Sequence, residues 1–216
     1  VDIFDVTDEN LGDWQPSYTL RPTDRVLIVA DNSQAKDGDA RPKRHLASAR
    51  WSLVPPWATT QKLSYPTFNA RSETAADKPT FRDAVRRSRC LIPADGYYEW
   101  LTHATTKTPF YIHPAEAGFP LAFAGLYSWW RASPSDSWHL TATILTREAT
   151  GSLSEIHDRM PVFADPALWT AWLDPASDGR AMLAVLAAAA THMATELTAY
   201  QVAPLIGDGP DLIRAV

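Results

Sequence analysis

The stretch Arg89-Cys90-Leu91-Ile92-Pro93-Ala94-Asp95-Gly96-Tyr97-Tyr98-Glu99-Trp100 gives the clearest indication of how this chain folds. Cys90–Pro93 is a short apolar run, which is typical of a buried strand. Asp95-Gly96 then marks a turn, and Tyr97–Leu101 resumes as a strand rich in aromatic residues. Two short strands around a turn indicate a protein rich in β-structure.

Further strand candidates lie on both sides of this stretch. They are Val26–Ala30, His45–Leu53, Pro109–His113, Leu121–Trp130, Trp138–Thr146 and Glu196–Val202. Helix candidates are fewer: Asp165–Leu173, Gly179–Ala190, and a short helix capped by Thr80 in which Phe81, Ala84 and Val85 share one face. The polar segment Asp31–Lys43 predicts an exposed loop. Strands and helices do not alternate in a βαβ rhythm, so we expect one α+β domain over residues 1–216, built around a strongly curved sheet.

The composition is that of an ordinary globular protein. Of the 216 residues, 45% are hydrophobic and 21% are charged, and the formal net charge is −5. A protein that coats long nucleic acids is usually basic, so DNA binding here would need a local basic patch and a short footprint. No apolar run could span a membrane, the first residues are not a signal peptide, and a single Cys excludes a disulfide framework. We therefore expect a cytoplasmic protein without membrane contact.

Several familiar chemistries have no support in this sequence. It contains neither GxGxxG nor GxxxxGK[ST], and its six His residues form no HExxH or comparable pair. We therefore expect neither a cofactor nor a metal site. Cys90, the only thiol, lies in the apolar strand, where a Cys more often packs as a small hydrophobic side chain than acts as a nucleophile.

Glu99 and His157 are candidates for proton transfer. Glu99 lies among aromatic residues, and a carboxylate desolvated by rings has a raised pKa that suits acid–base work. The commoner alternative is a Glu that faces water on an edge strand. Ile156-His157-Asp158-Arg159-Met160-Pro161 places an imidazole that titrates near neutrality beside an Arg that can bind phosphate. Its alternative is a local ion pair that closes a helix.

Two further polar segments are open to two interpretations each. Asn69-Ala70-Arg71-Ser72-Glu73-Thr74 carries an amide and a guanidinium, but its hydroxyl residues could simply cap a turn. Arg82–Arg89 contains four Arg and one Asp. It is either a phosphate contact site or a solvated helix face, and the solvated face is the commoner case.

Taken together and in this order, these segments resemble the SRAP family, the SOS-response-associated domains that process abasic sites. The resemblance covers nearly the whole chain and also rests on four other stretches. They are Trp51-Ser52-Leu53-Val54-Pro55-Pro56-Trp57, Leu121-Ala122-Phe123-Ala124-Gly125-Leu126, Thr143-Ile144-Leu145-Thr146 and Asp208-Gly209-Pro210-Asp211-Leu212-Ile213. No single motif is decisive, but the ordered set is specific. The resemblance implies a single domain with a strongly bent, barrel-like, mainly antiparallel sheet and peripheral helices.

The resemblance also implies a substrate and a mechanism. Members of the family bind single-stranded DNA at abasic sites, where an amino-terminal Cys attacks the open-chain sugar aldehyde with its amine and thiol and forms a thiazolidine. By similarity, Asn69 would position the Cys and the sugar, Glu99 would shuttle protons, and His157 would assist the Schiff-base and ring-opening steps. The implied DNA contacts are Arg71, Arg159, Trp57, Trp100, Pro22 and Thr146. We expect the three catalytic side chains to converge on one partly exposed pocket flanked by the two Arg, in a protein that acts as a monomer.

The start of the sequence departs from the family pattern. The family's amino-terminal Met-Cys-Gly-Arg stretch is absent, and Tyr18–Thr23 resembles a segment that follows it, so we expect that an amino-terminal piece is missing. Thr19 and Ser52 stand where the family usually has Asn and Gly, which affects local loop geometry. Two alternatives to crosslinking stay open. They are a non-covalent single-stranded DNA binding module and a thiol autopeptidase that trims its own amino terminus.

Overall fold

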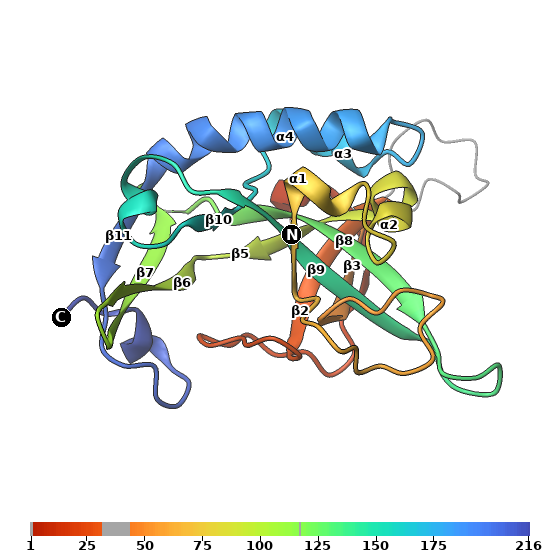
Figure 1. Cartoon of the computed structure of the whole chain (residues 1–216), viewed down its shortest axis with the longest axis horizontal. Coiled ribbons are helices and arrows are strands. Elements are labelled where there is room, and N and C mark those ends of the chain that lie inside the picture. The colour runs from red at the N-terminus through yellow and green to blue at the C-terminus, as the bar shows by residue number, and fades with distance from the viewer. Residues whose placement is uncertain (1, 32–43, 117) are drawn as a thin grey trace.

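Five strands close into a barrel at the centre of the protein (Figure 1). The computed structural model describes residues 2–31, 44–116 and 118–216. The barrel strands are β2 (Arg25–Asp31), β3 (Arg44–Trp51), β5 (Arg89–Ala94), β8 (Leu121–Trp130) and β9 (His139–Glu148). They pair in the order β3-β2-β5-β8-β9, and β9 closes the barrel by pairing back onto β3. The prediction of an α+β fold around a strongly bent, mainly antiparallel sheet is confirmed.

Three short strands extend the barrel sheet. β1 (Val6–Asn10) pairs in parallel with β3, and β4 (Asn69–Arg71) pairs in parallel with β9. β10 (Arg159–Pro161) pairs antiparallel with the opposite edge of β9. These three strands were not predicted from the sequence, because segments of three to five residues are too short to show a clear hydrophobic period.

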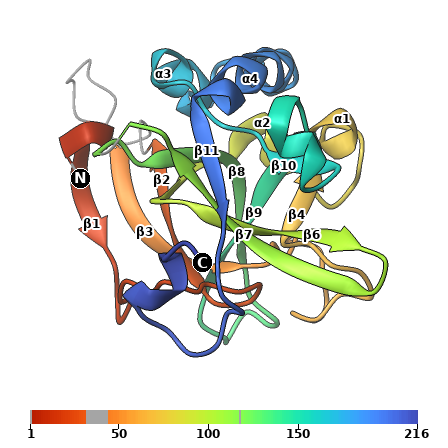
Figure 2. The ribbon, with the colours of Figure 1, turned by 90° about the vertical axis from the view of Figure 1, so that its left-hand side faces the viewer.

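A second sheet contains three antiparallel strands, β6 (Tyr97–His103), β7 (Thr106–Pro114) and β11 (Leu197–Gln201), in the order β11-β7-β6. In Figure 2, β11, β7 and β6 lie together on the side of the molecule that faces the viewer. The turn at Asp95-Gly96 therefore carries the chain from one sheet to the other and does not join a hairpin, because β5 pairs with β2 and β8. Gly96 is required there, since a Cβ would lie 2.5 Å from the Tyr111 ring.

The helices lie outside the barrel. α3 (Trp169–Leu173) and α4 (Gly179–Met193) run together along the top of Figure 1, with α1 (Ser72–Ala75) and α2 (Arg82–Arg87) below them. Short 3-10 turns occur at Asp2–Phe4, Gly151–Glu155, Pro166–Leu168, Ala194–Glu196 and Pro210–Ile213. The predicted helix 179–190 is confirmed and ends three residues later. The predicted helix 165–173 is divided into a 3-10 turn and α3.

The start of α4 shows why its local sequence folds in this way. Asp178 caps the helix by accepting hydrogen bonds from the backbone N–H groups of Arg180 and Ala181. Gly179 follows, and a Cβ at this position would lie 1.9 Å from the Val85 carbonyl oxygen. The close approach of α4 to α2 therefore depends on this glycine.

The α2 segment confirms one prediction and corrects another. Phe81, Ala84 and Val85 are buried, as their common face predicts. Thr80 does not cap the helix, because the residue before α2 is Phe81, and the Thr80 hydroxyl is hydrogen-bonded to the Tyr65 hydroxyl at 2.7 Å. For the predicted loop 31–43, Asp31 ends β2 and the remaining residues lie outside those that the structure describes.

Arg89 and Cys90 belong to the core and not to a reactive surface. The Arg89 guanidinium is buried and donates hydrogen bonds to the carbonyl oxygens of Val85, Trp172 and Asp174, so it joins the ends of α2 and α3. Burial lowers the pKa of Arg89 and raises the pKa of the fully buried Cys90 thiol. The prediction that Cys90 is a structural residue agrees with this burial.

Candidate active site

The carboxyl end of β9 brings together several residues identified from the sequence. Thr146 is paired with Arg71 of β4 on one side and with Pro161 of β10 on the other. Paired residues share a face of a sheet, and side chains alternate along each strand. Asn69, Arg71, Thr146 and Arg159 therefore belong to one face. The residues between them belong to the opposite face and are buried: Ala70, Leu145 and Met160.

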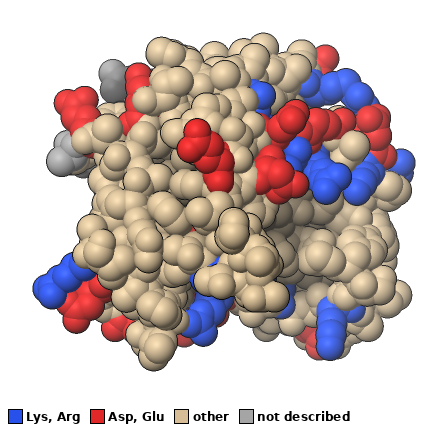
Figure 3. Space-filling model, turned by 60° about the vertical axis from the view of Figure 1, so that its left-hand side comes forward, with Lys and Arg blue, Asp and Glu red and all other residues tan. Residues whose placement is uncertain are grey.

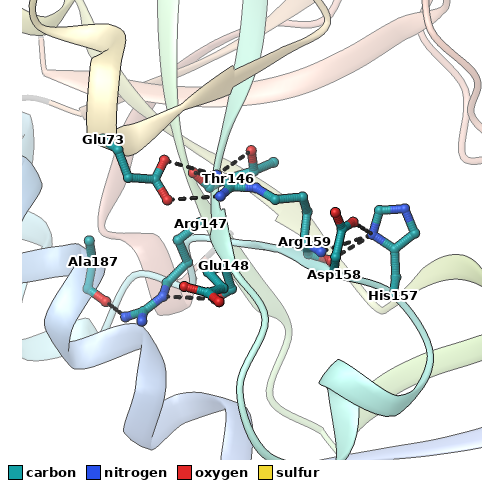
Figure 4. Close-up of polar contacts among 8 residues, drawn as sticks. All are labelled: Glu73, Thr146, Arg147, Glu148, His157, Asp158, Arg159 and Ala187. Atoms are coloured by element: carbon teal, nitrogen blue, oxygen red, sulfur yellow. Dashed lines mark hydrogen bonds and ion pairs between the residues drawn. The ribbon is translucent and has the colours of Figure 1, made fainter.

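Arg159 is held in place by Glu73 of α1 and by Thr146 (Figure 4). Its Nη1 and Nη2 donate to the two carboxylate oxygens of Glu73 at 2.8 and 2.9 Å, and Nη2 also donates to the Thr146 carbonyl oxygen at 2.8 Å. The hydrogen bonds from Arg159 lower the pKa of the Glu73 carboxyl. In this structure the guanidinium is therefore already bound to an anion.

Arg71 lies in a different environment on the same face. It is exposed, and within the described residues no hydrogen bond or ion pair involves its side chain. An exposed, unpaired guanidinium can bind a phosphate with two parallel hydrogen bonds. Asn69, two residues earlier on β4, is also exposed.

His157 lies directly before β10, and the backbone of Arg159 fixes its ring. The Arg159 N–H lies 2.9 Å from His157 Nδ1, and the Arg159 carbonyl oxygen lies 3.2 Å from the same nitrogen. The same Nδ1 lies 3.1 Å from a carboxylate oxygen of Asp158. The ring is 41% exposed and remains accessible to a substrate.

Glu99 lies on β6 and interacts with His157, which is distant in the sequence. Burial raises the pKa of the Glu99 carboxyl, the charge of His157 lowers it, and the charge of Asp158 raises it. Tyr97 lies on the same face of β6, two residues before Glu99, and packs edge-on against Phe123. Glu99 is thus a desolvated carboxylate beside an imidazole, even though β6 is an edge strand.

Among the described residues, no hydrogen bond, ion pair or ring contact joins Trp57, Pro22 or the Trp100 side chain to this cluster, although the Trp100 backbone is hydrogen-bonded to the Glu99 carboxylate. Trp57 is 56% exposed and lines a separate cavity of about 180 Å³ between α2 and β8, together with Pro55 and Pro56. Trp100 is exposed and, by strand alternation, lies on the face of β6 opposite Glu99. Pro22 is exposed in the loop before β2.

The charges on the surface are mixed. On the face shown in Figure 3, Lys and Arg side chains lie beside Asp and Glu side chains in several places. The structure contains several pairs of opposite charges, among them Arg159 with Glu73 and Arg180 with Asp77. On the face in Figure 3, Lys and Arg side chains are interspersed with Asp and Glu and form no broad basic surface.

Two residues of the cluster had no role in the sequence analysis. Glu73 binds Arg159, and Asp158 faces His157 and affects the pKa of Glu99. Both lie in the quoted motifs, but the pairing of Glu73 with Arg159 joins positions 86 residues apart, which spacing alone does not reveal. Within the described ranges, no three His, Cys, Asp or Glu side chains are placed to hold a metal ion.

The fold is that of an α+β protein with a closed barrel, in which Arg71 and Arg159 lie on the two strands that flank the end of β9, and Glu99 of the second sheet interacts with His157. The chain belongs to the SRAP family, because the family model described as SOS response associated peptidase (SRAP) matches residues 2–208. No helix among the described residues is long and apolar enough to cross a membrane.

Named relatives cover most of the chain. Abasic site processing protein YoqW of Bacillus subtilis (strain 168) is 35% identical over 209 residues, which span 94% of this chain and 88% of YoqW. Abasic site processing protein HMCES of Xenopus tropicalis is 32% identical over 174 residues, which span 70% of this chain and 51% of HMCES.

Two solved structures have the same fold. A protein from Bacteroides thetaiotaomicron matches with a TM-score of 0.74 and 22% identity, over 90% of this chain and 82% of that one. A protein from Bordetella bronchiseptica matches with a TM-score of 0.71 and 26% identity, over 94% of this chain and 93% of that one. The first likeness concerns the fold alone.

Proposed function

We propose that this protein recognises abasic sites in single-stranded DNA and bonds covalently to the open-chain sugar aldehyde. The nucleophile is an amino-terminal Cys that is not part of the present sequence, and the product is a thiazolidine whose formation is reversible. Membership of the SRAP family and the names of the relatives support this proposal. We propose further that the protein acts as a monomer in the cytoplasm.

The interaction between Glu99 and His157 is the observation that carries the proposal. These residues are distant in the sequence, Glu99 on β6 and His157 in the segment before β10, yet their charges affect one another. A carboxyl whose pKa is raised toward neutrality, beside an accessible imidazole, suits successive proton transfers. In a SRAP protein, the reaction that uses such a pair is attack on a sugar aldehyde.

The proposed chemistry needs protons to move at each step. The amine of the Cys adds to the aldehyde carbon, and the resulting carbinolamine loses one water to form an imine. The thiol then adds to the imine carbon, and its proton passes to the nitrogen as the ring closes. Glu99 gives a proton to the departing hydroxyl and takes one from the incoming nucleophile, while His157 assists at the imine and during ring opening. No oxidant or reductant takes part.

The proposed DNA path follows the face of β4, β9 and β10. Asn69 positions the Cys and the sugar, and Arg71 and Arg159 contact the phosphates beside the lesion. Thr146 lies between the two arginines in the sheet and completes this surface. Trp57, Trp100 and Pro22 are exposed and are proposed to contact the flanking, bent strand, where aromatic rings stack on unpaired bases.

Intact-mass spectrometry of protein from the full reading frame, mixed with single-stranded DNA that contains one abasic site, tests the proposal. We expect an adduct whose mass is that of protein plus DNA less one water. DNA with a tetrahydrofuran in place of the abasic sugar has no aldehyde and should give no adduct. Absence of the adduct with abasic DNA would overturn the covalent mechanism.

The same experiment separates the two alternative functions. Binding to abasic DNA without an adduct would identify a non-covalent single-stranded DNA binding module. Loss of amino-terminal residues in the absence of DNA would identify an autopeptidase. The present 216-residue chain should form no adduct, because its single Cys is buried in the barrel. An adduct that Cys90→Ala abolishes would contradict that expectation.

A further inference from the structure

The ion pair between Glu73 and Arg159 has a consequence for DNA binding that rests on the proposed function. Arg159 presents five N–H donors. Two of its nitrogens bind the Glu73 carboxylate, one of these also binds Thr146, and Nε is buried without a partner among the described residues. Few donors therefore remain for a second anion.

The position of Glu73 decides which end of the guanidinium a phosphate can reach. The Glu73 side chain is 47% exposed, whereas the Arg159 side chain is 21% exposed. The carboxylate caps the Nη1–Nη2 end, and Nε on the other side of the group is inaccessible. A phosphate that approaches from solvent therefore meets the negative charge of Glu73 before it can form two hydrogen bonds with Arg159.

We propose that Glu73 occupies the phosphate-binding end of Arg159 in the DNA-free protein, and that a DNA phosphate must displace this carboxylate in order to bind. Glu73 thereby weakens the attraction of the site for any DNA backbone. Arg71 can bind a phosphate whenever DNA is present. Arg159 binds a phosphate only when the strand is held closely enough for the phosphate to displace the Glu73 carboxylate.

Charge counting gives this proposal a measurable form. While Glu73 is ionised and paired, Glu73 and Arg159 together carry no net charge. Each phosphate neutralised on single-stranded DNA contributes about −0.7 to the slope of log K against log salt. Removal of the Glu73 charge should therefore tighten binding and make the slope steeper by up to about 0.7, so that the ratio of Kd at 200 mM to Kd at 50 mM salt grows about threefold.

The test measures the fluorescence anisotropy of the present chain with single-stranded DNA that carries one tetrahydrofuran site. Glu73→Gln and Glu73→Ala are compared with the wild type at several salt concentrations. Asp77→Asn is the matched control, because it also removes one negative charge from an ion pair with an Arg, here Arg180. We expect both Glu73 variants to bind more tightly than the wild type and Asp77→Asn to have a smaller effect.

Double variants show whether the effect passes through Arg159. In an Arg159→Ala background, Glu73→Gln should tighten binding no more than the control Asp77→Asn does, because only the general loss of one negative charge remains. Unchanged or weaker binding by folded Glu73 variants would overturn the proposal, as would failure of both variants to fold, because Glu73 would then be a structural residue. A wild-type chain that does not bind the DNA at all would instead contradict the proposed function. The two failures are therefore distinguishable.

Discussion

Glu99 and Glu73 are the same residue type and interact with neighbouring residues, His157 and Arg159, but they are held in opposite states. Glu99 is desolvated on β6, and burial raises its pKa. Glu73 is bound at both oxygens by a guanidinium, and its pKa is lowered. The difference shows that burial raises the pKa of a carboxyl and that pairing with a guanidinium lowers it. A raised pKa suits the proposed role of Glu99 in proton transfer, whereas a lowered pKa keeps Glu73 ionised at neutral pH.

Glu99→Gln should give the largest effect. The amide cannot donate or accept a proton in the way a carboxyl does, so we expect the rate of adduct formation by protein from the full reading frame to fall about 10²- to 10⁴-fold. Single-turnover reactions resolved on denaturing gels measure this rate. Glu73→Gln is the comparison and should cause no comparable loss. Equal losses in both variants would remove the distinction between the two carboxylates.

His157→Gln should slow adduct formation by roughly ten- to a hundredfold, because one of two proton-transfer groups is lost. It should also shift the pH profile. The positive charge of His157 lowers the pKa of Glu99, so its removal should raise that pKa further. The acidic limb of the rate profile, where protonation of Glu99 removes the base, should then move to higher pH. A limb that stays in place or moves to lower pH would show that Glu99 does not control it.

Arg71→Ala and Arg159→Ala should differ in their effect on DNA binding. Loss of the unpaired Arg71 should weaken binding to all sequences and reduce the salt slope by about 0.7. Loss of Arg159 should change the slope less, because Glu73 neutralises Arg159 in the free protein. Anisotropy titrations from 50 to 200 mM salt measure both slopes. Equal reductions would mean that Glu73 leaves Arg159 fully available to phosphate.

The smallest expected effects concern thermal stability. Because folding raises the pKa of Glu99, the folded state favours the protonated carboxyl. The protonated carboxyl therefore adds to the free energy of unfolding below the unfolded-state pKa, and this contribution is lost as pH rises through the folded-state pKa. Glu99→Gln should therefore raise Tm at pH 7, and the gain should disappear near pH 4. The lowered pKa of Glu73 has the opposite sign, since its contribution is present at neutral pH and is lost as pH falls through the folded-state pKa.

For Glu73→Gln this argument predicts a lower Tm at pH 7. The pair is partly exposed, so the loss should be about 1 kcal/mol or less, which corresponds to at most about 4 °C in a protein of this size. Calorimetry at pH 7 and pH 4 measures both variants. Shifts of the same sign at pH 7 would contradict the assignment of opposite states.

The sequence predicted the elements with a clear hydrophobic pattern and missed those without one. Leu121–Trp130 is a strand over the predicted bounds, because ten residues give a long apolar signal. β4 and β10, with three residues each, hold Asn69, Arg71 and Arg159 and were not predicted. The pairing of these strands with β9 depends on the closed barrel, which a local pattern does not reveal.

The candidate site was predictable to a similar extent. The aromatic surroundings of Glu99 correctly indicated desolvation, because that signal is local in the sequence. The aromatic residues beside Glu99 in the sequence do not all lie beside it in the structure. By strand alternation, Tyr97 lies on the same face of β6 as Glu99, whereas Trp100 lies on the opposite face. The binding of Arg159 by Glu73 joins two distant segments, and only the three-dimensional structure shows it.

The most direct test of the account is an NMR titration of the Glu side-chain carboxyl carbons, with Glu99→Gln and Glu73→Gln used to assign the two signals. We expect the carboxyl of Glu99 to titrate above the ordinary range for Glu and that of Glu73 below it, both in the DNA-free protein. Indistinguishable midpoints, or a Glu73 midpoint above that of Glu99, would contradict the division of roles between proton transfer and charge.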